Sequence, residues 1–306
     1  MIHQNTIVGI GETLFDVIGS QRALAGAPLN FCVMVNQLLQ STGFVTAIVS
    51  AVGNDMQGAN ARCQLANASI DTTHLQTHPT LPTGEARIRE SIEDDAECSF
   101  DILPNVAWDD LRWTVPLQKF TKQVSCVVYG TLPQRSAPSR QTIYKFLSAC
   151  PNAIRIFDVN LRDPHYDAEI IRDGCNAATI LKLNFHELST VAEADNIRSH
   201  QDPLATCRRL LEHFSLNAVV LTASNKGTTI VTADQTYTGK IPHVVVQSSV
   251  GAGDACTAGI VAGLTLNLEF ARVVGLANRM GAWIASNNAP NVALPDDLLN
   301  FDIADI

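Results

Sequence analysis

The sequence lacks the signals that mark several classes of protein. Eight cysteines occur among 306 residues, but none of them forms a Cys-x-x-Cys pair, so the spacing of a zinc site is absent and free thiols are expected. No segment offers about 18 consecutive uncharged apolar residues, and the amino terminus has no basic stretch ahead of an apolar one. We therefore expect a soluble, cytoplasmic protein without a membrane span.

Positive charge is also scarce. Lys and Arg total 21 against 30 Asp and Glu, which gives a formal net charge of −9, and no run of basic residues occurs. Such a chain is a poor candidate for binding nucleic acid or an anionic membrane surface. It can still carry a local basic group for a small anionic ligand.

Short apolar runs rich in β-branched residues alternate with amphipathic stretches along most of the chain. The apolar runs predict strands over residues 6–11, 44–53, 125–130, 153–160, 179–184 and 218–224. The amphipathic stretches predict helices over residues 27–39, 55–67, 139–150, 168–177 and 203–214. Because apolar strands separated by helices are typical of a parallel sheet covered on both faces, we predict an α/β fold.

Residues 83–102, TGEARIRESIEDDAECSFDI, interrupt this alternation. Polar and apolar residues alternate there around an acidic turn, which predicts a β-hairpin with one exposed face. Such a hairpin is either a lid over a binding site or an ordinary surface hairpin. No internal repeat or low-complexity linker is visible, so we predict one domain with this hairpin as an excursion.

The stretch HVVVQSSVGAGDACTAGIVAGL combines a strand-like run with a helix start. The predicted strand ends near Gln247, and Gly251, Ala252 and Gly253 then let the backbone turn and present N–H groups at the positive end of a helix. Asp254 falls in the first turn of that helix. It either caps the helix or acts as a catalytic base beside an anion-binding loop.

Other polar residues also follow predicted strands, where ligands of open α/β sheets bind. Asp16 lies just past the first strand, and Asn30 lies in the first helical turn after Gly26, so both suit a hydroxyl-rich ligand or are simply loop and helix-start residues. Asp158, Asn160 and Arg162 alternate and would share one face of an extended chain. Arg162 beside Asn160 suits a phosphate or carboxylate, or the segment simply holds a surface ion pair.

Two further loops have both a chemical and a plain structural interpretation. Asn184 and Glu187 could hold a hydrated magnesium ion through an amide oxygen and a carboxylate, or could form an Asn version of the helix capping box. The segment from Thr222 to Gly227 either contacts nucleotide phosphates or is a hairpin turn.

The order of these segments resembles that of the ribokinase-like (PfkB) carbohydrate kinases over nearly the whole chain. The matching segments are GETLFDVI, AGAPLNF, FDVNLR, NFHE, T-x-x-x-x-G and VGAGD, and the longer GETLFDVI, VAWDDL, FDVNLRDPHY and LKLNFHEL are most similar to bacterial fructokinases. The resemblance implies a single three-layer αβα domain over residues 1–306, with a mostly parallel sheet and a small β-sheet lid from residues 83–102 and also 17–24. It also implies ATP-dependent phosphorylation of a primary hydroxyl of a sugar.

The resemblance assigns roles to individual residues. Asp254 becomes the general base, and the N–H groups of Gly251, Ala252 and Gly253 become the anion hole for the transferring phosphoryl group. The sugar contacts are Asp16, Gly26, Asn30, Arg87, Arg162 and Asp254. The contacts to ATP are Asn160, Asn184, Thr222, Gly227, Gly251, Gly253 and Asn278. Asn184 and Glu187 bind Mg²⁺ through water.

Several positions depart from the family pattern D-T-x-G-A-G-D and its companions. Ser248 replaces an aspartate near the monovalent-cation site of many relatives, so the sequence leaves potassium dependence open. Ala25 replaces the first glycine of a Gly-Gly pair. Ser224 replaces a glycine of the nucleotide loop and is strained there if its φ is positive. Cys256 replaces an aromatic residue.

Three functions are therefore weighed. The first is a fructokinase that makes fructose 6-phosphate. The second is a 2-keto-3-deoxygluconate kinase, which gains weight if Arg87 and Arg89 of the hairpin face the cleft and meet an acidic substrate. The third is a sugar- or nucleotide-binding protein that has lost catalysis. A homodimer paired through the lid is compatible with each, since free hairpin edges favour association.

Overall fold

The computed structural model describes residues 5–89, 99–287, 289 and 292–299, and its chain builds two sheets. The strands are β1 (Thr6–Ile10), β2 (Leu14–Ile18), β3 (Gln21–Ala25), β4 (Val45–Gly53), β5 (Leu75–His78), β6 (Gly84–Arg89), β7 (Ser99–Ile102), β8 (Val124–Tyr129), β9 (Ile154–Asp158), β10 (Ile180–Asn184), β11 (Ala218–Thr222), β12 (Thr228–Val231) and β13 (Thr236–Thr238).

The helices alternate with these strands. They are α1 (Ala27–Leu39), α2 (Met56–Asn67), α3 (Val115–Phe120), α4 (Ala137–Ala149), α5 (Ala168–Ala177), α6 (Glu187–Glu193), α7 (Pro203–His213), α8 (Ala252–Thr265), α9 (Phe270–Ala285) and α10 (Asp296–Leu299), with short 3₁₀ turns η1 (Ala107–Asp110), η2 (Thr121–Gln123), η3 (Leu132–Arg135) and η4 (Ser224–Lys226).

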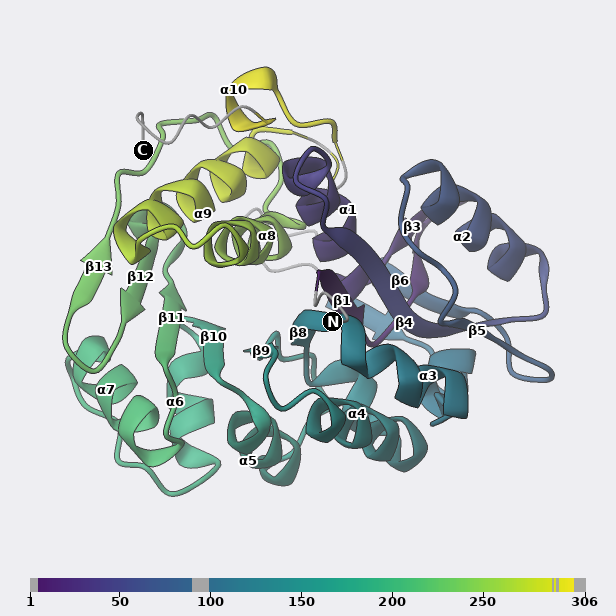
Figure 1. Cartoon of the computed structure of the whole chain (residues 1–306), viewed down its shortest axis with the longest axis horizontal. Coiled ribbons are helices and arrows are strands. Elements are labelled where there is room, and N and C mark those ends of the chain that lie inside the picture. The colour runs from purple at the N-terminus through teal and green to yellow at the C-terminus, as the bar shows by residue number, and fades with distance from the viewer. Residues whose placement is uncertain (1–4, 90–98, 288, 290–291, 300–306) are drawn as a thin grey trace.

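The large sheet has the strand order β13-β12-β11-β10-β9-β8-β1-β4-β5. Its strands pair in parallel except at β12 and β13, which are antiparallel. Helices cover both faces, with α1, α8 and α9 on one side and α4 to α7 on the other (Figure 1). Consecutive residues Ile7 and Val8 of β1 are both fully buried and belong to separate apolar clusters on the two faces. The predicted three-layer α/β fold is thus confirmed.

The small sheet has the order β3-β2-β6-β7. β6 and β7 are antiparallel, which confirms the hairpin predicted for residues 83–102, although residues 90–98 lie outside the described part. β2 and β3 form a second hairpin at the position predicted for residues 17–24, and β2 pairs in parallel with β6. Ala86, Ile102 and Trp108 belong to an apolar cluster that supports this sheet.

The prediction of a strand that ends near Gln247 is wrong. β13 ends at Thr238, and residues 239–249 form no strand. The N–H groups of Gln247 and Ser248 donate to the carbonyl of Ala285 at the end of α9 instead of to a neighbouring strand. The apolar side chains of this run therefore find no sheet to pack on, and Val245 is 77% exposed.

The cysteines and the helices bear on two expectations drawn from composition. The seven cysteines within the described residues are free, and six of them are buried, whereas Cys98 lies outside the described part. None of the helices described is both long enough and apolar enough to cross a bilayer.

Candidate active site

The polar residues singled out in the sequence converge on one edge of the large sheet. Because β1, β8, β9, β10 and β11 run in the same direction, their carboxyl ends lie at that edge. The loops that follow them meet the first turns of α1 and α8 there, and α1 and α8 pack against each other. This is the position at which open α/β sheets bind ligands.

Asp254 lies in the first turn of α8 but does not cap it. The capping position is Gly251, whose φ of 81° is left-handed, and no side chain caps the helix. The Asp254 carboxylate instead accepts a hydrogen bond of 2.8 Å from the Asn30 amide of α1. The simple capping interpretation is therefore wrong, and the two residues are brought together by the packing of two helices.

Glu12 is a site residue that the sequence analysis missed. Its side chain is buried at 4% exposure, and its Oε1 accepts a 3.1 Å hydrogen bond from the N–H of Ala27. Burial raises its pKa to about 7, against the lowering effect of its backbone hydrogen bonds. Its position just after the fully buried strand β1 could have indicated a site residue, as the position of Asp16 did in the same segment.

The carboxyl groups of Glu12, Asp254 and Asp16, the last in β2 of the small sheet, are all influenced by one guanidinium. Burial raises the pKa of Asp16 to about 6 and that of Asp254 to about 6, as it raises that of Glu12. In each case the positive charge of Arg162 acts in the opposite direction. Arg162 therefore acts electrostatically on all three acids.

The segment from Asp158 to Arg162 differs from its prediction. β9 ends at Asp158, and Asn160 has a left-handed φ of 42°, so Asp158, Asn160 and Arg162 do not share one face of an extended chain. Asp158 is not part of a surface ion pair either, because it is 6% exposed and binds the equally buried Lys182. The turn at Asn160 separates a buried acid from the more accessible Arg162.

Asn184 and Glu187 form the reciprocal bonds of a capping box. Asn184 Oδ1 accepts from the N–H of Glu187 at 3.0 Å, and Glu187 Oε2 accepts from the N–H of Asn184 at 2.8 Å. Glu187 Oε1 accepts from the N–H of Leu161 at 2.9 Å, which ties the loops after β9 and β10 together. Asn184 Oδ1 also accepts from the N–H of His186 at 2.9 Å, whereas each Glu187 oxygen has a further lone pair. The carboxylate therefore fits a magnesium ion that keeps most of its waters, with Asn184 beside it. No cluster of three or more potential metal-binding side chains occurs among the described residues.

Comparison with known proteins agrees with this geometry. The model of the family described as pfkB family carbohydrate kinase matches residues 7–297 of the chain. The chain belongs to the pfkB family of carbohydrate kinases. This membership supports an ATP-dependent sugar kinase as its activity class.

Individual relatives and structures are similar over nearly the full length of the kinase. A fructokinase from Klebsiella pneumoniae is 26% identical over 94% of this chain and 96% of its own. A fructokinase structure with bound ATP from Xylella fastidiosa has a TM-score of 0.81 at 22% identity, covering 97% of this chain and 98% of that one. A fructokinase structure from Vibrio cholerae O395, in a form with fructose, ADP and calcium ion, has a TM-score of 0.79 at 19% identity, covering 97% and 99%.

The predicted nucleotide loop of the kinase is also a hairpin. Thr222, the last residue of β11, pairs with Thr228 of β12, and Gly227 closes the turn with a φ of 77°. Asn278 of α9 is buried and fixes this loop from behind, because its Oδ1 accepts from the N–H of Thr228 and its Nδ2 donates to the carbonyls of Gly239 and Lys240. The structure thus brings Thr222, Gly227 and Asn278 together at the end of β11.

Ser224 in this loop has a φ of 45°, so the residue that replaces the family glycine is in the left-handed region. We expect Ser224→Gly to stabilise the kinase by about 0.5–1 kcal/mol, the relief of left-handed strain less the entropy that glycine loses on folding. Ser224→Ala keeps the strain and is the matched control. Urea unfolding measures both variants, and equal stabilities for the two would contradict the strain argument.

The predicted sugar contact Arg87 does not lie on the same face of the small sheet as Asp16. In the small sheet, Asp16 of β2 is opposite Ala86 of β6, and Arg87 is opposite Val17. Adjacent residues of a strand face opposite sides of a sheet, so Arg87 projects away from Asp16. Its side chain is exposed, and the side chain of Arg89 is outside the described part.

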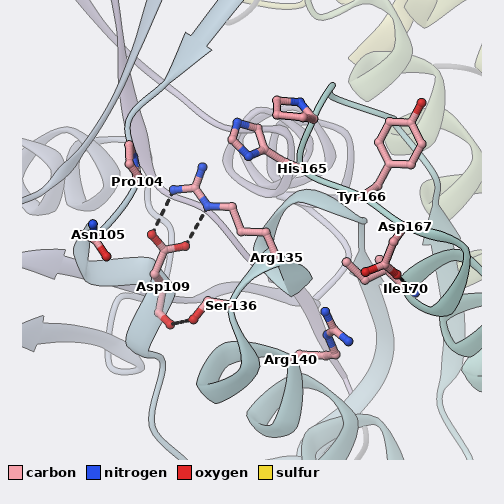
Figure 2. Close-up of a pocket in the computed structure, with 11 residues that line it drawn as sticks. Pro104, Asn105, Asp109, Arg135, Ser136, Arg140, His165, Tyr166, Asp167 and Ile170 are labelled. Carbon is pink, nitrogen blue, oxygen red and sulfur yellow. Dashed lines mark hydrogen bonds and ion pairs between the residues drawn. The ribbon is translucent and has the colours of Figure 1, made fainter.

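A cavity of about 430 Å³ opens beside the loop that follows Arg162 (Figure 2). None of the predicted site residues lines it. Arg135 crosses it, donates to both carboxylate oxygens of Asp109 at 2.8 and 2.9 Å, and stacks 4.1 Å above the ring of Trp108. Its charge is therefore already compensated within the protein.

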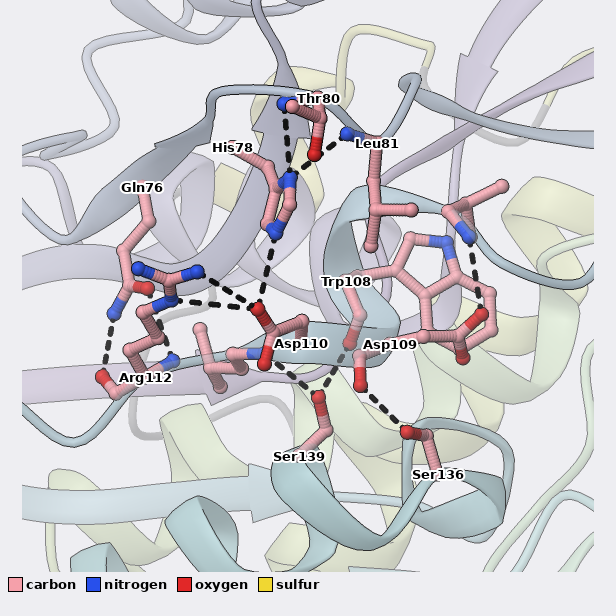
Figure 3. A network of polar contacts seen from close by, with 12 residues as sticks. Gln76, His78, Thr80, Leu81, Trp108, Asp109, Asp110, Arg112, Ser136 and Ser139 are labelled. Carbon is pink, nitrogen blue, oxygen red and sulfur yellow. Dashed lines mark hydrogen bonds and ion pairs between the residues drawn. The ribbon is translucent and has the colours of Figure 1, made fainter.

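Trp108 and Asp109 belong to the turn η1, which further hydrogen bonds hold in place (Figure 3). Ser136 Oγ donates to the carbonyl of Asp109 at 2.6 Å, and Ser139 Oγ donates to the carbonyl of Trp108 at 2.7 Å. His78 contacts Asp110 at 3.0 Å and accepts from the N–H of Leu81 at 2.8 Å. The two serine bonds hold η1, whose Trp108 packs against the small sheet, in place against α4.

Proposed function

We propose that the kinase transfers the γ-phosphoryl group of ATP to a primary hydroxyl of a neutral ketose, with fructose converted to fructose 6-phosphate. The observation that carries this proposal is the half-buried Asp254, which lies at the mouth of α8 and is held by Asn30. The names of the relatives add support for fructose, and the Vibrio cholerae structure is of a form with fructose and ADP.

The charge around Asp254 favours a neutral sugar over a sugar acid. Arg162 already acts on Glu12, Asp16 and Asp254, so the carboxylate of 2-keto-3-deoxygluconate would add further negative charge to the same region. Arg87, which a sugar acid would have used, projects from the other face of the small sheet. Hydroxyl groups, by contrast, can donate hydrogen bonds to these carboxylates.

In the proposed reaction, Asp254 accepts the proton of the sugar hydroxyl. The oxygen attacks the γ-phosphorus in line, the bond to the bridging oxygen breaks, and ADP leaves. N–H groups in the first turn of α8 have no intrahelical partners and stabilise the charge on the transferring group. Ala252 donates a long 3.3 Å bond to the carbonyl of Ser249, so Gly253 and its neighbours in that turn carry more of this role.

Asn184 and Glu187 would hold a hydrated Mg²⁺, and Asn160, Thr222, Gly227 and Asn278 would form the surroundings of ATP. Bound Mg²⁺ supplies neutralisation of phosphate charge during transfer. Ser248 lies where many relatives have an aspartate, so potassium dependence is tested separately. The small sheet would act as a lid that excludes water, with its outer face available for a homodimer that light scattering can detect.

The test is a coupled assay of ADP release with ATP and Mg²⁺ over fructose, tagatose, ribose, adenosine and 2-keto-3-deoxygluconate, with and without potassium. We expect turnover with fructose to exceed that with every other sugar. Turnover with only the sugar acid would overturn the substrate and keep the mechanism. Binding of ATP or sugar without ADP release would instead support a non-catalytic binding protein.

The activity should also report the unusual pKa of Asp254. A general base must be deprotonated, so kcat/KM falls as the pH drops below the pKa of the free enzyme. With burial raising the pKa of Asp254 from 3.8 to about 6, we expect the acidic limb near pH 6 and a decline of about tenfold per pH unit below it. A profile measured from pH 4.5 to 9 decides this, and full activity down to pH 4.5 would contradict it.

A further inference from the structure

A buried ion pair lies directly beneath the mouth of α8. Lys182 of β10 and Asp158 of β9 are register partners in the parallel sheet, and both are 6% exposed. Lys182 Nζ donates to Asp158 Oδ1 at 2.9 Å and to Oδ2 at 3.0 Å. A buried pair of this kind is costly to desolvate and is often no more stable than apolar residues of the same size. Stability alone therefore gives no reason to have it here.

The pair is linked to the first turn of α8. Thr257 Oγ1 of α8 donates to Asp158 Oδ2 at 2.8 Å. Lys182 Nζ lies 3.4 Å from the position that a Cβ atom on Gly253 would occupy, so the ammonium lies beside the glycine of the VGAGD loop, and a side chain there would be in contact with it.

The sign of the charge is the unusual feature. The amino end of a helix is its positive end, so a nearby cation is unfavourable unless an anion is also present. Asp158 supplies one such anion. A phosphoryl group at the mouth of α8 would supply another, and the ammonium would then add to the attraction of the N–H groups.

We propose that Lys182, held by Asp158, is a positioning residue for phosphoryl transfer, which supports the first turn of α8 and places a positive charge behind its anion-binding N–H groups. This inference rests on the proposed function, because it assigns a part in the same transfer. It adds two residues that the sequence assigned no such role, one of them in the middle of a strand.

The pair also acts on the neighbouring base. Asp158 raises the pKa of Asp254 and Lys182 lowers it, while burial is the larger cause of its elevation. The charged and polar groups that face Asp254 come from five segments and are Glu12 after β1, Asn30 of α1, Asp158 of β9, Arg162 after β9, and Lys182 of β10. Removal of the ammonium alone therefore leaves Asp158 acting on the base without its partner, and Arg162 remains as a cation near it.

Two variants of the full-length kinase separate an electrostatic role from a purely structural one. Lys182→Met leaves Asp158 buried without its partner, whereas the double variant Lys182→Met/Asp158→Asn removes both charges at nearly constant volume. We expect the double variant to recover most of the Tm lost by the single one, yet to keep a kcat lower than the wild type by about tenfold or more, with KM for the sugar little changed. A merely structural pair predicts that kcat recovers together with the Tm.

The pH profile supplies a second readout. We expect the acidic limb of kcat/KM to move up by about one pH unit in Lys182→Met and to return to or below its wild-type position in the double variant. A double variant with wild-type kcat and an unshifted limb in the single variant would overturn the inference.

A measurement without turnover keeps the inference distinct from the proposed function. Carboxyl ¹³C resonances of aspartate-labelled protein are titrated, and that of Asp254 is assigned by its loss in Asp254→Asn. If no sugar is phosphorylated, the proposed function fails, but an upward shift of the Asp254 titration in Lys182→Met still supports the charge pair. The same titration in both proteins would overturn it.

Discussion

Asp254→Asn should lower kcat by about 10³-fold while leaving the fold and the binding of ATP intact. The amide is nearly the same size as the carboxylate, and its oxygen can still accept the hydrogen bond from Asn30 that is 2.8 Å long in the structure. What the variant loses is the ability to take a proton from the sugar hydroxyl. ADP release measured with saturating sugar and ATP reports kcat, and calorimetry reports nucleotide binding.

The control for this substitution is Asp234→Asn. Asp234 is exposed in the turn between β12 and β13. Its substitution makes the same chemical change at a position outside α8. We expect its kcat to match the wild type. An Asp254→Asn protein that keeps kcat within tenfold of the wild type would contradict the assignment of this residue as the base.

Gly26→Ala should be the most damaging substitution outside the reacting groups. Gly26 joins β3 to α1 with a φ of 124°, and a Cβ atom there would lie 2.6 Å from the backbone oxygen of Glu12. Its own carbonyl accepts the N–H of Asn30 at 2.9 Å. The alanine must therefore displace Glu12 or the start of α1, and Asn30 would move with it away from Asp254.

We expect Gly26→Ala to cost about 2–3 kcal/mol of unfolding free energy and about 10²-fold in kcat/KM. Gly43→Ala is the matched control, because Gly43 has a φ of 80° and open space around its Cβ position. It should cost only about 1–2 kcal/mol of left-handed strain and leave kcat/KM unchanged. Equal kcat/KM for the two variants, measured well below their Tm, would show that the contact with Glu12 is unimportant.

Local patterns were sufficient where the side-chain period sets the element. The predicted helices over residues 27–39 and 168–177 coincide with α1 and α5, because amphipathic periodicity depends only on neighbours within the helix. The pattern failed at Val244–Val246, where an apolar β-branched run has the composition of a strand. Strand formation also needs a partner, and the residues that follow this run, Gln247 and Ser248, are bonded to the end of α9.

The sequence by itself determined the α/β alternation, the hairpin of residues 83–102 and the order of loops that identifies a carbohydrate kinase. Only the tertiary structure decided that Asn30 binds Asp254 across 224 positions, that Glu12 is buried beside them, and that Lys182 meets Asp158 under α8. These contacts depend on strand register and helix packing, which bring together residues far apart in the chain. Burial then changes their chemistry, because a carboxyl group or an ammonium removed from water responds to each neighbouring charge, and no local stretch of sequence specifies that surrounding.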